Sequence, residues 1–208
     1  GLVRMETFQA VDGGHSGNYL GGIVGYITSE SSVTVTLCYN TGGVRIGCGS
    51  GLVQDCIVSG VVGRMDAPGS ITSCNNNGGA IAMNITANNV GPKDLYTAGI
   101  LGKSEQDVTI SGCSNTGAIS GGNSTNVSGT AFYMGGIAAY LKGSSKILNC
   151  SNTGTTVSTH SGNNDTIGST CLTGGIAGFV EGTSEDHIEI GGTTGCTVNT
   201  SDALSATR

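Results

Sequence analysis

Apolar and polar residues alternate along the chain in short runs separated by polar turns. The run Val33-Thr34-Val35-Thr36-Leu37 has the period of two that is typical of a strand with one buried face. A Gly-Gly-Ile segment lies before this run, and an apolar position, Val44, lies after it. Because the Gly-Gly-Ile segment also alternates and is bounded by glycine, we interpret it as a short strand. This stretch therefore predicts three short strands joined by turns.

The same pattern returns at a nearly constant interval. The second glycine of the Gly-Gly-Ile motif and its variants stands at 22, 60, 99, 136 and 175, which gives spacings of 38, 39, 37 and 39 residues. A Cys-x-Asn-x-Gly motif begins at 38, 74, 113 and 150. The fifth unit has Gly191-Gly192-Thr193-Thr194-Gly195-Cys196 in its place. Two motifs that recur in the same order indicate a repeat architecture.

Short strands at a fixed period predict an all-β fold, a right-handed parallel β-helix (β-solenoid) of about five coils. Equivalent residues of successive units would stack and bury a continuous core. The expected core columns are Ile23, Val61, Ile100, Ile137 and Ile176; Tyr19, Ile57, Tyr96, Tyr133 and Leu172; and Val44, Ala80 or Ile81, Ile119 and Val157. We expect a single domain, 1–208, with a partial N-terminal coil at 1–18 and repeat units at 19–56, 57–94, 95–131, 132–170 and 171–208.

Each unit is longer than three short strands require. The excess falls at 45–56, 82–94, 120–131 and 158–170, between the third expected strand and the next Gly-Gly. These stretches are polar and vary from unit to unit. They are either excursions from one corner or extra strand-bearing half-coils. The pattern therefore leaves open whether each unit forms one coil or two.

The motifs resemble a known repeat. The segments Gly21-Gly22-Ile23-Val24-Gly25-Tyr26 and Leu37-Cys38-Tyr39-Asn40-Thr41-Gly42-Gly43-Val44 are similar to the GLUG repeat of large bacterial surface proteins, which include adhesins. The resemblance covers roughly residues 19–198, with a longer period and a degenerate fifth unit. It implies a β-solenoid on an exported protein and transfers no catalytic residues.

Composition and charge narrow the classes of partner that the protein is expected to bind. Charged residues make up 11% of the chain, the net charge is −6, and the eight Lys and Arg residues are scattered. A nucleic-acid partner would require a basic patch, so we expect none. No apolar run is long enough to span a bilayer, so we expect no membrane insertion of this segment. The N-terminus does not have the pattern of a signal peptide, which indicates a removed signal or a segment of a longer chain.

Four of the eight cysteines occupy one column, namely Cys38, Cys74, Cys113 and Cys150. A buried Cys packs as a small apolar side chain, and stacked side chains that point the same way have poor disulfide geometry. We therefore expect mostly reduced thiols, with neighbouring disulfides or a metal site as the alternatives. Cys56 and Cys171 share a column with Leu95 and Phe132, which favours the core. Cys48 and Cys56 could instead bridge, and the disulfide states of Cys48, Cys56, Cys171 and Cys196 stay open.

Two further columns are polar. Asn40, Asn76, Asn115 and Asn152 coincide with a corner where Asn and Gly tolerate left-handed backbone, so we interpret them as a structural ladder rather than a ligand row. Thr28, Asp66, Glu105, Lys142 and Glu181 follow the Gly-Gly motif at a fixed distance. Carboxylates there could hold a cation, but the Gly-Gly-x-Gly-x-Asp pattern of calcium-binding solenoids is missing. We expect a solvated corner.

Aromatic and cationic residues share one more column. Its members are Tyr26, Arg64, Lys103, Tyr140 and Phe179. Mixed occupancy of this kind suggests partial exposure, because such side chains keep a polar end in water. These five residues are the candidate ligand contacts, for a glycan or protein ligand.

An enzyme needs catalytic side chains that converge in one site, and the sequence predicts no such set. The three histidines, His15, His160 and His187, do not recur, and neither a nucleophile elbow nor a zinc-protease motif is present. We expect no cofactor and no metal. The leading hypothesis is a non-enzymatic, exported cell-surface β-solenoid, either a monomer or part of a longer chain, for adhesion or as a stalk that presents loops. The alternative is a carbohydrate-binding or polysaccharide-processing β-helix.

Overall fold

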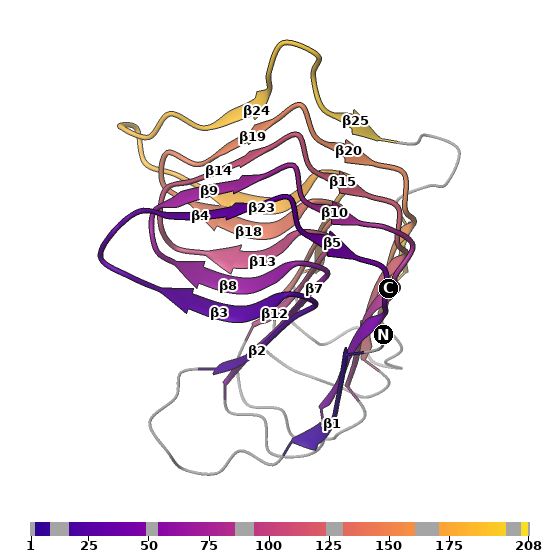
Figure 1. Cartoon of the computed structure of the whole chain (residues 1–208). Coiled ribbons are helices and arrows are strands. Elements are labelled where there is room, and N and C mark those ends of the chain that lie inside the picture. The colour runs from indigo at the N-terminus through magenta and orange to yellow at the C-terminus, as the bar shows by residue number, and fades with distance from the viewer. Residues whose placement is uncertain are drawn as a thin grey trace.

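Parallel strands stacked in sheets form the whole of the described structure (Figure 1). The computed structural model describes residues 3–8, 17–48, 54–85, 94–123, 131–160, 171–198 and 205–207. Strands joined by turns make up these residues, and their strand pairs are parallel, as in the pairings β12 with β7 and β12 with β17. The protein is therefore an all-β solenoid.

The strands belong to five sheets. Sheet A contains β1 (Val3–Phe8), β6 (Val44–Cys48), β11 (Ile81–Ile85), β16 (Ile119–Asn123), β21 (Thr156–His160) and β26 (Ser205–Thr207). Sheet B contains β2 (Gly17–Gly21), β7 (Asp55–Ser59), β12 (Leu95–Ala98), β17 (Phe132–Gly135) and β22 (Cys171–Gly174). Sheet C contains β3 (Val24–Thr28), β8 (Val62–Asp66), β13 (Leu101–Ser104), β18 (Ala138–Lys142) and β23 (Ala177–Glu181).

Sheets D and E complete each unit. Sheet D contains β4 (Val33–Thr36), β9 (Gly69–Thr72), β14 (Val108–Ser111), β19 (Lys146–Leu148) and β24 (Glu189–Gly191). Sheet E contains β5 (Tyr39–Asn40), β10 (Asn75–Asn76), β15 (Ser114–Asn115), β20 (Ser151–Asn152) and β25 (Thr197–Val198). One unit therefore supplies one strand to each sheet, two strands more than the three expected. The excess stretches carry the rest of the sheet A strands, and the first of them, 45–56, also carries the start of β7.

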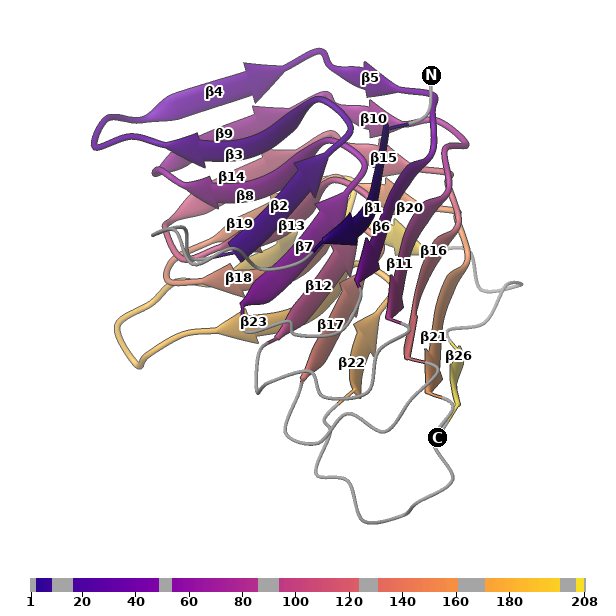
Figure 2. The same ribbon diagram turned by 90° about the horizontal axis from the view of Figure 1, so that it is seen from below.

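The cross-section is bent into an L, as the view along the stack shows (Figure 2). One arm holds an apolar cluster between sheets C, D and E, which includes Ile71, Ile110 and Ile147. The other arm holds a second cluster between sheets A and B, which includes Ile81, Leu95 and Met134. A third, smaller cluster lies where the outer faces of sheets B and C meet inside the angle of the L. We call this region the concave angle.

The Gly-Gly-Ile motif forms the bend between sheets B and C, so its interpretation as a strand was wrong. A Cβ added to Gly99 would lie 2.3 Å from the Gly136 carbonyl oxygen and 2.5 Å from Cγ of Asn115. Only glycine leaves room there for both the next unit's backbone and the asparagine of its own unit. The two sequence motifs therefore meet across the interior, and the isoleucine that follows, such as Ile100, is fully buried.

Two column assignments need correction. The left-handed position is not the asparagine but the residue before each cysteine, as at Leu37 (φ 55°) and Ser73 (φ 52°). The asparagines themselves lie in sheet E. In the third column, Ile119 pairs with Thr156 rather than with Val157, and Thr156 is 2% exposed. A one-residue offset moves a side chain to the opposite face, which is why the more apolar residue was the wrong choice.

Candidate functional site

The five candidate ligand contacts are neighbours in sheet C. Tyr26 pairs with Arg64, Arg64 with Lys103, Lys103 with Tyr140, and Tyr140 with Phe179. The pairing skips the residue before each of them, for example Gly63 and Gly102. Val62 and Met65, which lie before and after Arg64, both point into the core, so the in-and-out alternation is interrupted between them and the row turns outward. The row therefore faces the concave angle.

A second row faces it from sheet B. It is the column Tyr19, Ile57, Tyr96, Tyr133 and Leu172, whose register the structure confirms. It does not lie inside either arm, as a core column would, but on the outer face of sheet B. The two rows interlock: Tyr96 stacks on Tyr133 with ring centroids 5.0 Å apart, and Tyr140 meets Tyr96 edge-on at 5.7 Å.

Arg64 is held from several sides. Its guanidinium lies 5.2 Å from the ring centre of Tyr19 and donates a 3.0 Å hydrogen bond to the Tyr19 hydroxyl. It also pairs with Asp66, with Nε 2.8 Å from Oδ2. The Tyr26 hydroxyl donates to the same carboxylate at 3.0 Å. The fixed fork of donors on Arg64 is therefore already engaged by the protein.

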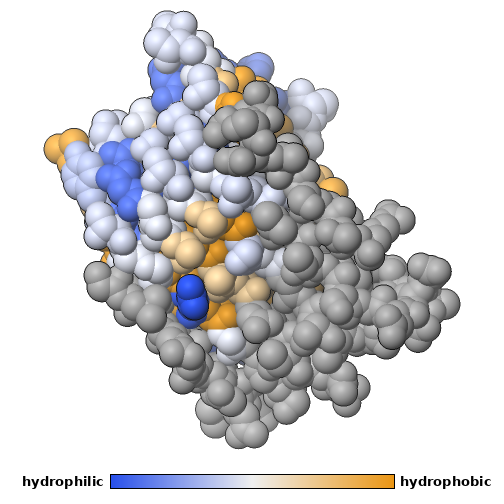
Figure 3. Space-filling view, turned by 90° about the vertical axis from the view of Figure 1, so that its right-hand side faces the viewer, coloured by the Kyte–Doolittle hydropathy of each residue, from blue (hydrophilic) through white to orange (hydrophobic). Residues whose placement is uncertain are grey.

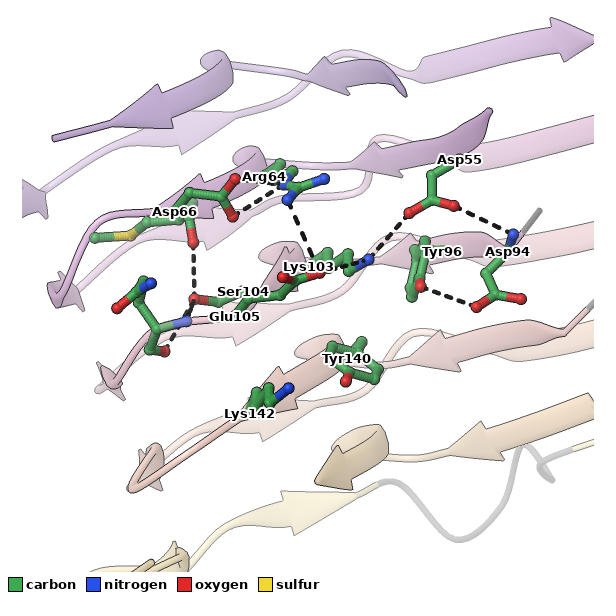
Figure 4. Close-up of polar contacts among 12 residues, drawn as sticks. Asp55, Arg64, Asp66, Asp94, Tyr96, Lys103, Ser104, Glu105, Tyr140 and Lys142 are labelled. Carbon is green, nitrogen blue, oxygen red and sulfur yellow. Dashed lines mark hydrogen bonds and ion pairs between the residues drawn. The ribbon is translucent and has the colours of Figure 1, made fainter. Parts of the chain in front are cut away.

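Lys103 crosses the concave angle (Figure 4). Its Nζ lies 3.0 Å from Oδ2 of Asp55, on sheet B, and 2.9 Å from Oε1 of Glu105, which follows β13. It also lies 4.7 Å from the ring centre of Tyr96. Burial lowers the pKa of Lys103, but the two carboxylates outweigh this and hold the pKa above its ordinary value. The same contact lowers the pKa of Glu105.

Exposure differs along the row. Tyr26 and Phe179, at its two ends, are 43% and 37% exposed, whereas Lys103 and Tyr140, in its middle, are 7% and 8% exposed. The expectation of partial exposure is therefore wrong for the middle of the row. Aromatic faces that stack on one another, and cations that are already paired, are not available to a ligand without rearrangement.

The structure adds carboxylates to the cations of the row. Arg64 and Lys103 are neighbours, as their shared column predicted. Asp55 and Asp94 were not singled out, although they flank the facing row; Asp94 accepts a 3.3 Å hydrogen bond from the Tyr96 hydroxyl. The sequence of β12 contained a signal for the facing row. If Leu95 is inside the A–B arm, strand alternation puts Tyr96 on the outer face.

The column Thr28, Asp66, Glu105, Lys142 and Glu181 lies beside this row, with Thr28 paired to Asp66 and Lys142 to Glu181 as expected. Its charged members form ion pairs. Within the described part of the chain, no three His, Cys, Asp or Glu side chains gather as metal ligands. His187 is exposed, while His15 and the side chain of His160 lie outside the described residues.

The asparagine column forms a ladder through the C–D–E arm. Each side-chain Nδ2 donates to Oδ1 of the next residue, from Asn40 to Asn76 (2.8 Å), from Asn76 to Asn115 (2.7 Å) and from Asn115 to Asn152 (2.8 Å). Val198 continues the column and ends the ladder. These amides satisfy one another, as the sequence predicted, and none is offered to a ligand.

The cysteine column also stacks in this arm, and Cys74, Cys113 and Cys150 are buried as free thiols. Cys196 is a fifth member that the sequence did not reveal, because Ser151 pairs with Thr197, one residue after it. Neighbouring thiols and burial raise the pKa of Cys113. Cys56 is buried in the A–B arm. The side chains of Cys48 and Cys171 lie outside the described residues, and so does the expected Cys48–Cys56 bridge.

No protein-family model matches the chain, and neither does any curated protein or solved structure. Among the described residues, no helix has the length and apolar character needed to cross a membrane.

Proposed function

We propose that this protein is a non-enzymatic, exported cell-surface β-solenoid of the GLUG-repeat kind, and that it acts as a stalk or spacer. One observation carries the proposal: the repeated side chains bind one another. The asparagines form a ladder, the cysteines pack in a column, and the aromatic and cationic row is paired within the concave angle. A repeat whose repeated residues all serve stacking is suited to holding length and shape.

Several features of this proposal follow from the repeat. Each unit would form one coil, giving five coils wound in a right-handed sense. The protein would reside outside the cell, as a monomer or as part of a longer chain. The flank shown in Figure 3 supports an exposed setting, because pale and hydrophilic residues cover much of its described surface around a central apolar patch, with further apolar residues at its edges.

The concave angle gives little support to an enzyme. Asp55 and Glu105 lie on either side of Lys103, close enough to be considered as a catalytic carboxylate pair. However, a general acid must keep its proton near neutral pH, and the Lys103 ammonium favours the ionised form of Glu105. Glu105 is therefore held as a carboxylate and does not supply the resting protonated acid that a glycosidase pair needs.

Glycan binding is the second candidate function. It rests on Tyr26 and Phe179, whose rings are the exposed ends of the aromatic row. Exposed aromatic faces with a polar surround suit sugar rings, and Tyr26 lies beside Asp66. A host or extracellular glycan or protein would then be the partner, and the stalk would itself be adhesive.

A glycan array with the purified protein separates the two functions. For a stalk, we expect no glycan to be retained above the level of a Tyr26→Ala, Phe179→Ala double variant. The double variant is a suitable control because both side chains lie at the exposed ends, where their removal leaves the buried middle of the row intact. Retention of one glycan class by the parent and its loss in the double variant would overturn the stalk proposal in favour of adhesion.

A further inference from the structure

Lys103 is placed differently from the other lysines that form ion pairs in the described part of the chain. Its side chain is 9% exposed and that of Asp55 is 17% exposed. Two aromatic rings, Tyr96 and Tyr140, lie 4.7 and 5.5 Å from its Nζ. Two carboxylates touch the same nitrogen, one across the angle on β7 and one two residues along the chain (Figure 4). An amine and two carboxylates therefore meet at one point, where Lys103 and Asp55 are mostly buried and Glu105 reaches solvent.

We propose that Lys103 and Asp55 become joined by an amide bond that the protein forms on itself, with Glu105 as the catalytic proton carrier. Lysine is a nucleophile once it loses its proton, and a positioned carboxylate can remove that proton. Fixing the two reacting groups in contact replaces a very unfavourable encounter between a free amine and a free acid. The inference concerns a covalent modification and holds whether or not the protein is a stalk.

The step balances without any co-reactant. Glu105 takes one proton from the Lys103 ammonium and passes it to the Asp55 carboxylate, and the neutral Nζ then attacks Cγ of the resulting carboxylic acid. Glu105 takes the second proton lost from nitrogen and gives it to the departing hydroxyl, which leaves as one water molecule. The Nζ–Cγ bond forms, a Cγ–O bond breaks, and Glu105 ends as a carboxylate. The net change is loss of one water, with nothing oxidised or reduced.

Other contacts favour this direction of reaction. The backbone N–H of Asp94 donates to Oδ1 of Asp55 at 3.3 Å, which fixes the carboxyl group and can stabilise charge that develops on that oxygen during attack. Glu105 is 43% exposed, so it can exchange protons with solvent while its Oε1 touches Nζ. Because the product amide is not reversed under ordinary conditions, even a slow step accumulates.

Two further lysine–carboxylate pairs serve as internal controls. Lys142 lies 3.9 Å from Glu181, and Lys146 lies 3.4 Å from Glu189. All four of these side chains are 41% exposed or more. Water competes for these groups, and in the described part of the chain neither lysine contacts a second carboxylate. We expect both pairs to stay uncondensed.

The bond would have a structural consequence. Asp55 and Lys103 are 48 residues apart, on sheets B and C of different units. Linking them closes the concave angle and ties consecutive units together. Such a cross-link restricts the unfolded chain, as a disulfide does, so it raises the midpoint of thermal unfolding.

The test is the intact mass of the whole folded protein after incubation at neutral pH, followed by a proteolytic map. We expect a mass lower than the sequence mass by one water, and a cross-linked peptide pair that contains Asp55 and Lys103 without tryptic cleavage after Lys103. The Lys103→Arg variant keeps the charge and cannot form the bond, so it should show the full sequence mass and a lower unfolding midpoint. Lys146→Arg, the matched control, should lose one water like the parent.

Two further variants sharpen the result. In Asp55→Asn the same attack would expel ammonia instead of water, and the mass loss should change accordingly. In Glu105→Gln, an exposed position whose replacement should preserve the fold, most of the protein should retain its sequence mass. The proposal is overturned if the folded parent keeps its sequence mass, or if its water loss maps to a single peptide, as an internal succinimide would.

Discussion

At the scale of single residues, the structure is built from positions whose backbone or packing dictates the residue type. The residue before each cysteine has left-handed backbone, occupied by Leu37, Ser73, Gly112, Asn149 and Gly195 in turn. Glycine adopts this conformation without cost, asparagine tolerates it, and leucine and serine are strained there. Leucine and serine occupy this position in the first two units, so it does not repeat one residue type, which is why the left-handed residue was assigned to the asparagine column instead.

Replacing Ser73 by glycine should therefore stabilise the protein. Relief of left-handed strain exceeds the extra chain entropy that glycine brings, and we expect a gain of about 0.5–1 kcal/mol in the free energy of unfolding. Denaturant titration measures it. Thr34→Gly, at an exposed strand position, is the control and should destabilise. A loss of stability in Ser73→Gly would show that the side chain matters more than the backbone angle.

Cys113 tests the column of thiols. The thiol is buried and its pKa is raised by neighbouring thiols and burial, so the reactive thiolate is disfavoured. Alkylation of Cys113 should be slow in the native state and fast after unfolding, while the half-buried Cys38 should react sooner. Cys113→Ala should keep the fold at a cost of about 1–2 kcal/mol. A mapped disulfide between Cys74 and Cys113 would contradict the packing account.

At the scale of elements, the repeat predicts the stacking but not the bends. Spacing alone placed Leu95 beside Phe132, and Tyr96 beside Tyr133, and the structure has both pairs in register. The concave angle could not be predicted, because it depends on how a glycine bend turns sheet B against sheet C. Without knowledge of that bend, Tyr96 is expected in the core and Lys103 on the surface. In the structure, Nζ of Lys103 lies 4.7 Å from the ring centre of Tyr96.

The coupling between the glycine bend and the asparagine ladder gives a prediction at this scale. Gly99→Ala would force a Cβ against the Gly136 carbonyl and Asn115, and backbone cannot give way cheaply. We expect a loss of about 2–3 kcal/mol, at the upper end for overpacking, by thermal or chemical unfolding. In the control Gly121→Ala the nearest atom belongs to the flexible side chain of Met134, so the loss should be smaller.

Asn115→Gly removes both asparagine atoms that the added Cβ would meet, Cγ at 2.5 Å and Cβ at 2.7 Å. The double variant Gly99→Ala, Asn115→Gly should therefore lose less stability than the two single losses combined. Strict additivity would mean that the glycine and the asparagine do not meet, and that the co-occurrence of the two motifs has another origin.

At the scale of the whole molecule, the apolar core of the solenoid is covered along its length and exposed at its two ends. The large apolar side chains that are exposed in the described structure all belong to the first or last unit, among them Ile23 (44%) and Ile190 (49%). Their counterparts in the middle units, Ile100 and Ile147, are fully buried. Stability should therefore rise from both ends toward the middle, as nearest-neighbour stacking requires.

Truncating a side chain in the middle of the core tests how much this stack contributes to the free energy of unfolding. Ile100→Ala removes a fully buried side chain between two covered units and should cost about 2–5 kcal/mol. Ile23→Ala, in the same column but half exposed, should cost much less. Chemical denaturation measures both, and equal losses would mean that the column is not a continuous core.

Hydrogen exchange of the native protein tests most directly the central claim that repeated residues stack unit upon unit. Backbone amides of β9, β14 and β19, which have a strand on each side, should exchange most slowly. Amides of the end strands β4 and β24 should exchange faster. A uniform rate across the repeat, or slowest exchange in the end strands, would contradict the continuous stack from which the proposed stalk function follows.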